Sequence, residues 1–225
     1  MAKKPLSTPG AIDWLNDTDW VYAPVQDRSR KTLRQILTTA KTLFVAKGFD
    51  ETTVTEISRQ SKISVGSIYH RFPDKQSILY AILETYRRTR FAEIDELTRE
   101  ALWQGKGAAD VLDFHIEIIF SASRKDRGFF RLIERQRIVD KVVRDMQIEW
   151  NQRFCDIIAG LLRPHAGDLG HADIDRAVRY AHNIIRGSVM WSILPDQDGE
   201  LPLQVNSDEY RAEARRMAAA YLGIH

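Results

Sequence analysis

Residues 53–75 read TVTEISRQSKISVGSIYHRFPDK and contain the signals for two short helices joined by a tight turn. Thr53 and Glu56 have the Thr-x-x-Glu spacing of a capping box, which predicts a helix that begins directly after Thr53. The polar stretch that follows ends this helix, and Ser64 is placed to cap a second one, whose first turn is residues 65–67. Two helices joined by so short a turn predict a helix-turn-helix.

The second helix of such a pair enters the major groove of DNA by its N-terminal end. Small or hydrogen-bonding residues are therefore expected there, and Ser64, Gly66 and Ser67 meet this requirement. Ile68 and Phe72 lie one helical turn apart, so we expect both to pack inward. The outer side of the helix is then left to polar and aromatic residues that can contact a duplex.

We expect Tyr69 and Lys75 to position the protein on phosphates, because a phenol and an ammonium donate hydrogen bonds without reading sequence. Val65, Ser67 and His70 are better placed for base edges or the thymine methyl group. The expected DNA-contacting residues are Thr53, Thr55, Ser64, Val65, Gly66, Ser67, Tyr69, His70, Arg71 and Lys75.

The residues that carry a family likeness are Ile63, Ser64, Gly66, Ile68, Tyr69, Phe72 and Lys75, preceded by Ile36, Ala40, Leu43, Phe44, Gly48, Phe49 and Thr53. In spacing and residue type this pattern resembles the DNA-binding signature of TetR-family transcriptional regulators, and it covers about a quarter of the chain. Lys62 departs from it, since many members have glycine in the turn. Either the backbone avoids positive φ at Lys62 or this residue is strained.

Composition limits the class of protein. The chain of 225 residues is 44% hydrophobic, which is enough for a buried core, and no apolar run approaches the roughly 18 residues of a membrane span. The start MAKKPLSTPG lacks an apolar region, so no secretory signal is expected. A single cysteine, Cys155, cannot form an internal disulfide. These features favour the cytoplasm.

Charge is unevenly distributed along the chain. The net charge is only +2, but residues 28–90 hold 13 Lys and Arg against 5 Asp and Glu. The rest of the chain is acidic by 26 residues to 20. A basic head on an acidic body suits a protein that binds phosphates at one end, although solvated helix faces would give the same count.

The whole chain has helical periodicity and shows no strand-like alternation, so the expected fold class is all-α, with an N-terminal helix-turn-helix head of three helices joined by a long helix to a larger helical body. We expect residues 1–27 to be a flexible tail, 28–75 the DNA-binding domain and 76–225 the effector-binding and dimerisation domain. Outside the helix-turn-helix, the expected helices are 30–47, 75–102, 108–123, 127–138, 141–162, 174–194 and 208–222.

Small and apolar residues recur on the last two expected helices. In the family that the chain resembles, these two helices of each subunit commonly form a four-helix dimer interface, and the resemblance implies the same here. The expected interface residues are Ala177, Ala181, Ile184, Ser188, Trp191, Ala212, Met217, Ala218 and Tyr221. An ordinary intramolecular core is the alternative explanation of the same pattern.

His115 and His182 each interrupt an apolar helical stripe, and aromatic residues are abundant near them in sequence. Apolar pockets with a few polar groups are the usual form of small-molecule sites, so we expect a moderately large and mostly apolar effector. Core histidines and core aromatics would give the same pattern. The expected effector residues are Phe114, His115, Ile118, Phe120, Met146, Trp150, Phe154, His182 and Arg186.

Catalysis is not expected. The six histidines form no His-x-x-x-His or Glu-x-x-His pair, one cysteine cannot supply a zinc cluster, and there is no glycine-rich phosphate loop. Nothing in the sequence supplies a base for Cys155. We therefore expect no cofactor and no metal.

These features together favour a homodimeric DNA-binding regulator whose two heads bind a palindromic operator. The resemblance implies a repressor that a small molecule releases from DNA. Two alternatives remain: a constitutive DNA-binding regulator without a small-molecule effector, and a helical small-molecule carrier whose helix-turn-helix is vestigial. An activator with the same head would have the same sequence pattern.

Overall fold

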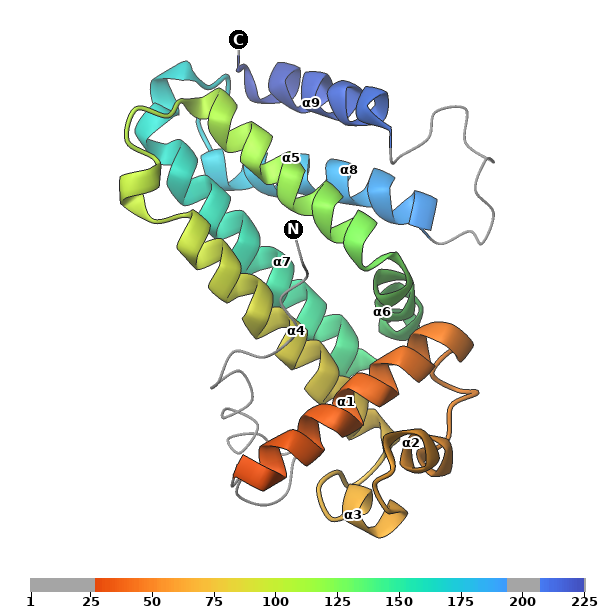
Figure 1. The fold of residues 1–225 in the computed structure, drawn as a ribbon. Helices are drawn as coiled ribbons and strands as arrows, with labels where there is room; N and C mark the ends of the chain where they lie inside the picture. The colour runs from red at the N-terminus through yellow and green to blue at the C-terminus, as the bar shows by residue number, and fades with distance from the viewer. Residues whose placement is uncertain (1–26, 194–206, 225) are drawn as a thin grey trace. The chain divides into compact units, whose positions relative to one another are not determined.

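The computed structural model describes residues 27–193 and 207–224, and every regular element within those ranges is a helix (Figure 1). The expected tail lies, but for its last residue, outside the described residues. The helices are α1 (Asp27–Lys47), α2 (Val54–Ser61), α3 (Val65–Tyr69), α4 (Lys75–Leu97), η2 (Glu100–Leu102), α5 (Ala108–Lys125), α6 (Arg127–Val139), α7 (Lys141–Leu162), η3 (Arg163–Asp168), α8 (Ile174–Ile193) and α9 (Asp208–Leu222).

The chain divides into two compact units, Met1–Glu96 and Leu97–His225. The first unit holds α1 to α3 and nearly all of α4, whereas the sequence-based boundary of the DNA-binding part was residue 75. The all-α class expected from the sequence is confirmed. No helix within the described ranges is long and apolar enough to span a membrane.

The core of the first unit consists of apolar side chains that α1 to α4 turn toward one another. α1 ends where Gly48 adopts φ +98°, a conformation that glycine tolerates and other residues avoid. α2 packs against both α1 and α3. The fully buried residues that join these helices are Leu33, Ile36, Phe44, Ile57, Ile68, Phe72, Ile78 and Leu79.

The cap of α2 differs in part from the expected capping box. The Thr53 hydroxyl accepts the backbone N–H of Glu56 at 3.1 Å, as predicted. The Glu56 carboxylate, however, forms an ion pair with Lys47 at the end of α1 instead of returning to the start of α2. Glu56 therefore ties α2 to α1, which a reading of the local sequence alone did not predict.

α4 is shorter than the expected helix, because it ends at Leu97 and a 3-10 turn follows. The indole N–H of Trp103 donates to the Leu97 carbonyl oxygen at 2.9 Å and so caps this end. Leu97 itself is about half exposed.

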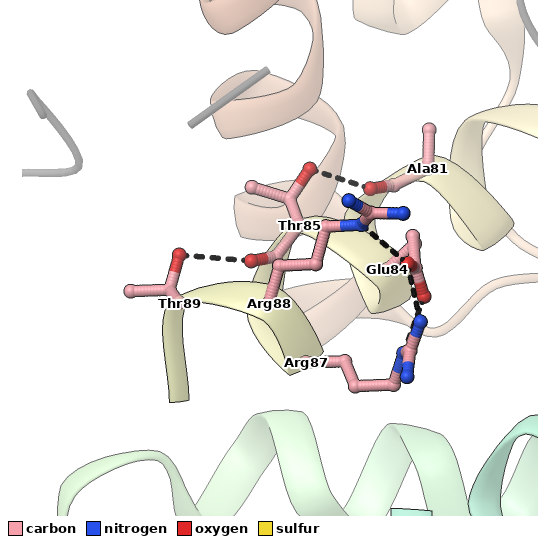
Figure 2. A network of polar contacts seen from close by, with 6 residues as sticks. All are labelled: Ala81, Glu84, Thr85, Arg87, Arg88 and Thr89. Atoms are coloured by element: carbon pink, nitrogen blue, oxygen red, sulfur yellow. Dashed lines mark hydrogen bonds and ion pairs between the residues drawn. The ribbon is translucent and has the colours of Figure 1, made fainter. Parts of the chain in front are cut away.

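A buried carboxylate lies in the middle of α4 (Figure 2). Glu84 accepts hydrogen bonds from Arg87 at 2.6 Å and from Arg88 at 2.7 Å. Burial raises the pKa of Glu84, but the hydrogen bonds and charges of the two guanidinium groups outweigh it and hold that pKa below its ordinary value. Glu84 is therefore ionised at neutral pH and is compensated within its own helix.

The second unit is a bundle built around α7 and α8. α8 packs against α5, α6, α7 and α9, and α9 also lies along α5 (Figure 1). The ends of α7 and α9 agree with those expected. Asp140 and Ser207 explain where they begin, since their side chains accept backbone N–H groups of the first turns of α7 and α9.

Candidate DNA-binding surface and interior polar site

The first turn of α3 is exposed and capped as the sequence predicts. Ser64 accepts the backbone N–H of Ser67 at 3.2 Å and also donates its hydroxyl proton to the Ser67 hydroxyl oxygen at 2.8 Å. One of the two hydroxyl protons is therefore left for an outside acceptor. The two serines stabilise the helix tip and leave one hydrogen-bond donor available on it.

Gly66 lies in this exposed turn with open space around it. A Cβ atom added there would meet nothing within 4 Å, and φ at Gly66 lies outside the left-handed region. The fold therefore does not require glycine at this position. If the absence of a side chain matters at Gly66, the reason lies in something that approaches the helix tip from outside.

Most of the other expected DNA-contacting residues are at the surface. Tyr69 is 49% exposed although α3 ends with it, and His70 follows it in an exposed position. Thr53 and Thr55, at the start of α2, are exposed as well. Val65 and Arg71 are half-buried. These side chains come from the start of α2 and from α3 with the turn after it.

Lys75 differs from the expectation that its ammonium reaches a phosphate. Its Nζ donates to the carbonyl oxygens of Phe49 at 2.8 Å, Asp50 at 3.3 Å and Thr52 at 3.0 Å. It also lies 4.3 Å from the centroid of the Phe49 ring. These carbonyls occupy its three donors, so in this geometry Lys75 holds the loop between α1 and α2 in place.

The backbone at Lys62 shows which of the two expected alternatives holds, the avoidance of positive φ or local strain. Its backbone has φ 57° and ψ 27°, the left-handed conformation in which glycine is favoured. Among the residues that the structure describes, it is the only one other than glycine with positive φ. The turn between α2 and α3 therefore carries local strain at Lys62.

In the second unit, His115 of α5 and His182 of α8 form a buried pair. His115 Nε2 and His182 Nδ1 are 3.2 Å apart, and the rings are stacked with centroids 5.4 Å apart. Phe154 of α7 packs edge-on against both rings, at 5.4 and 5.6 Å. On the other side, His182 Nε2 lies 3.4 Å from Asn151 Oδ1. Three of the expected effector residues are thus brought together.

Both imidazoles are neutral at physiological pH. Burial lowers the pKa of His115 to about 3, and the neighbouring His182 adds to this effect. Burial also lowers the pKa of His182 to about 4, with the positive charge of Arg186 as the second cause. A neutral imidazole has one donor and one acceptor nitrogen, so the pair can form its hydrogen bond without any charge.

Arg186, one turn after His182 on α8, belongs to a second group of polar side chains. Glu134 of α6 is only 2% exposed and forms an ion pair with Arg186. It also accepts hydrogen bonds from Arg137 at 2.5 Å and from Gln147 of α7 at 2.8 Å. We call Glu134, Arg137, Gln147 and Arg186 the Glu134 cluster. Of these four, sequence reasoning identified only Arg186, and the i,i+3 spacing of Glu134 and Arg137 was the available signal for the others.

The remaining expected effector residues are placed elsewhere. Phe114 packs edge-on against Trp103 at 5.3 Å, and Phe120 packs against Tyr210 of α9 at 6.1 Å. Ile118, Met146 and Trp150 are half-buried. These contacts do not join the nine residues into one group. A groove of about 310 Å³ lies between α5 and α9, and it is lined by Asp113, Ile116, Asp208, Arg211, Ala212 and Arg215.

The expected dimer residues also fall into two groups. Ala177, Ala181 and Ala218 are almost fully buried within the unit. They belong to the intramolecular core and not, as expected, to a dimer interface. Their small side chains allow close packing of α8 and α9 against their neighbours. Ile184, Trp191, Ala212 and Met217 are exposed, while Ser188 and Tyr221 are half-buried.

Cys155 has no nucleophilic character here. It is buried, and burial raises the pKa of its thiol to about 12, so the thiolate is not formed at neutral pH. This agrees with the expectation from the sequence that Cys155 is not a catalytic residue.

A capped helix pair whose second helix has an exposed, open N-terminal turn defines a helix-turn-helix protein. The family model described as "Bacterial regulatory proteins, tetR family" matches residues 36–82, from the middle of α1 into α4. The HTH-type transcriptional regulator HbdR of Aromatoleum sp. (strain CIB) is 31% identical over 141 residues, which are 58% of this chain and 59% of HbdR. The match thus spans less than two thirds of that relative.

Two solved structures have the same fold. Salmonella enterica GusR superposes with a TM-score of 0.65 at 18% identity, covering 88% of this chain and 98% of GusR. The transcriptional regulator FadR from Bacillus subtilis, in complex with stearoyl-CoA, superposes with a TM-score of 0.62 at 19% identity, covering 85% and 98%. Residues 36–82 therefore match the tetR family of bacterial regulatory proteins, and the fold of the chain matches that of these solved structures. HbdR is described as a transcriptional regulator, and so is FadR.

Proposed function

We propose that the chain is a homodimeric DNA-binding transcriptional regulator, a repressor that a small molecule releases from a palindromic operator in the cytoplasm. The observation that carries the DNA-binding part is the open tip of α3. Gly66 is exposed there without any requirement from the fold, and Ser64 and Ser67 are arranged to leave one hydrogen-bond donor outward. Backbone at such a tip can approach the base edges of the major groove closely.

The other side chains of this surface divide by chemistry. Tyr69 and His70 are exposed beside the tip and supply a phenol and an imidazole, while Thr53 and Thr55 add hydroxyls at the start of α2. Hydroxyl and phenol donors suit phosphate oxygens, which position a head without reading sequence. We assign Lys75 a positioning role in the head in place of a phosphate contact, because its three donors are on carbonyl oxygens.

A dimer is supported by the exposed side of α8 and α9. Tyr180, Ile184 and Trp191 recur on one face of α8, and Trp191 is 69% exposed. Met217 of α9 is exposed as well. Large apolar side chains grouped on neighbouring helices are typical of protein interfaces. Two heads on one dimer can read half-sites about 34 Å apart, which increases affinity without a larger domain.

Control by a small molecule is supported by the polar site in the interior of the second unit and by the stearoyl-CoA bound to the neighbour FadR. A ligand releases the operator only if it binds the DNA-free conformation more tightly than the DNA-bound one. We propose that this difference changes the separation of the two heads, so that they no longer fit both half-sites.

Gly66→Val tests the DNA-binding part. Fluorescence anisotropy with DNA from around the chain's own coding region should show binding by the wild type that weakens steeply with salt. Gly66→Val should lose at least a hundredfold in affinity while its melting temperature stays the same. Gly160→Val is the control, because Gly160 is exposed on α7 and an added Cβ would meet only Arg163, at 3.8 Å. Equal binding by the two variants would exclude the α3 tip as the contact.

Trp191→Glu tests the dimer. Analytical ultracentrifugation should show a dimer for the wild type and a monomer for Trp191→Glu. Ile148→Glu, at a similarly exposed apolar position on α7, should remain a dimer. A dimer in all three proteins would place the interface elsewhere. Salt-insensitive or absent DNA binding by the wild type would favour the small-molecule carrier instead.

A further inference from the structure

The Glu134 cluster places a carboxylate in the interior of the second unit. Glu134 is almost fully buried, and it accepts from donors on three helices: Arg137 of its own α6, Gln147 of α7 and Arg186 of α8. A buried carboxylate is tolerated only when donors of this kind surround it. The cluster is therefore a built polar site that joins α6, α7 and α8.

The charges of the cluster do not balance. Two guanidinium groups, those of Arg137 and Arg186, share the single carboxylate of Glu134. The Arg186 side chain is only 20% exposed, and burial lowers the pKa of Arg186 even though Glu134 opposes the effect. Arg137 is 41% exposed, so its charge reaches solvent, whereas that of Arg186 depends on a partner inside the unit. A single additional negative charge next to Arg186 would neutralise the cluster.

His182, one helical turn before Arg186 on α8, and the side chains around it are uncharged. His182 precedes Arg186 by four residues and so lies on the same side of the helix. With His115 and Phe154 it forms a cluster of three rings, and Asn151 borders the cluster on α7. Aromatic surface with neutral hydrogen-bonding groups suits the apolar or aromatic part of a ligand.

From this arrangement we propose that the interior of the second unit binds a monoanionic, mainly apolar carboxylic acid, whose carboxylate replaces Glu134 on Arg186. Its apolar part lies toward the rings of His115, Phe154 and His182. The proposal rests on the proposed function, because it names the chemical class of the effector.

The exchange leaves no buried charge without a partner. When the ligand takes Arg186, Glu134 keeps the hydrogen bonds from Arg137 and Gln147. Arg186 gains a carboxylate in place of the one it loses, and its fork of donors can bind the new one in bidentate fashion. The ion pair between α6 and α8 is broken in the process, so α6 is the helix that responds to the ligand.

Thermal shift on the full-length protein without DNA tests the ligand class. Decanoate and 2-naphthoate are compared with decanol and 2-naphthalenemethanol, which have the same apolar parts without the charge. We expect at least one acid to raise the melting temperature by several degrees in a saturable way, while its alcohol does not. Equal shifts for acid and alcohol, or no shift with either acid, would overturn the proposal.

Variants of the cluster test the position of the carboxylate. Arg186→Gln should weaken binding of the acid at least tenfold, and Glu134→Gln should strengthen it because Arg186 loses its competitor. Arg179→Gln is the control and should bind normally, because Arg179 lies on α8 like Arg186 but forms an exposed ion pair with Asp156 of α7. If Arg186→Gln does not fold, the double variant Glu134→Gln/Arg186→Gln, which buries no charge at these two positions, takes its place. Unchanged acid binding by Arg186→Gln, or by the double variant that takes its place, would exclude Arg186 as the partner of the ligand carboxylate.

The two proposals fail separately. Acid binding is measured without DNA, and DNA binding by the Gly66 variants is measured without acid. A protein that binds DNA but no acid would keep the proposed regulator and lose the carboxylic-acid effector. A protein that binds the acid but no DNA would lose the proposed regulator.

Discussion

Lowering the pH from about 7.5 to about 5 should destabilise the second unit through the histidine pair. In the folded protein His115 and His182 stay neutral until the pH approaches about 3 and about 4, because burial lowers both pKa values from 6.5. In the unfolded chain both protonate below pH 6.5. The unfolded state therefore binds more protons between these limits, and the free energy of unfolding falls as the pH falls.

The size of the effect follows from the pKa of the unfolded chain. A pH of 5 is about 1.5 units below the pKa of an unfolded histidine. At 1.36 kcal/mol per unit, protonation stabilises the unfolded chain by about 2 kcal/mol for each histidine. The folded pKa values are lower still, so they do not limit the effect at this pH. Together the two histidines should remove about 4 kcal/mol of stability, a large share of the roughly 5–15 kcal/mol of an ordinary domain.

Urea unfolding at the two pH values measures this loss. The quantity compared is the difference in the free energy of unfolding between pH 7.5 and pH 5, so a change in packing that acts equally at both pH values cancels. His182→Gln should reduce that difference by about 2 kcal/mol relative to the wild type. Phe154→Leu disturbs the same three rings without removing a titrating group, so its pH difference should equal that of the wild type. An equal loss of stability on acidification by His182→Gln and the wild type would contradict a contribution of His182.

Further substitutions test single features of the backbone and the head. Gly223→Ala should destabilise the protein by roughly 2–4 kcal/mol, because φ is +77° and the added Cβ would lie 2.5 Å from the Gly170 nitrogen. Gly105→Ala, with φ +74° and open space, should lose only about 1 kcal/mol. Equal losses of the two variants in urea unfolding would exclude an effect of the close approach to Gly170. Lys62→Gly should stabilise by about 0.5 kcal/mol through relief of positive φ, whereas Lys62→Ala keeps the strain; a greater stability of the alanine variant would argue against the left-handed turn. Lys75→Met should cost about 1–3 kcal/mol of stability, since three loop carbonyls lose their donor, and should leave the slope of log affinity against log salt unchanged; a slope smaller by about one would return Lys75 to a phosphate.

The ends of most helices could be predicted because their causes are local. Thr53 and Ser64 cap α2 and α3 through residues three positions away, and Gly48 ends α1 through its own φ. The end of α4 was missed because it depends on Trp103, which reaches back six residues to the Leu97 carbonyl. The α3 tip was predictable for the same reason as the caps, since its residues are neighbours in sequence.

The interior of the second unit was only partly predictable. Hydrophobic periodicity identified His115 and His182 as interruptions of apolar stripes, but they are 67 residues apart, and their contact depends on the packing of α5 against α8. Glu134 was not identified because a carboxylate in a helix with several arginines is usually a surface residue. Its burial follows from donors on α7 and α8 that meet only in the folded bundle.

The sequence by itself determined the all-α class, the helix-turn-helix and the serine caps of its recognition helix, because each depends on residues within about one helical turn. Only the tertiary structure decided that Ala177, Ala181 and Ala218 belong to the core while Trp191 stays exposed, since small side chains suit close helix packing within a subunit and between subunits alike. The tertiary structure also decided that Lys75 turns into the head and that Glu134 meets Arg186. The physical reason is that a buried polar group needs partners, and those partners come from helices far apart in the chain.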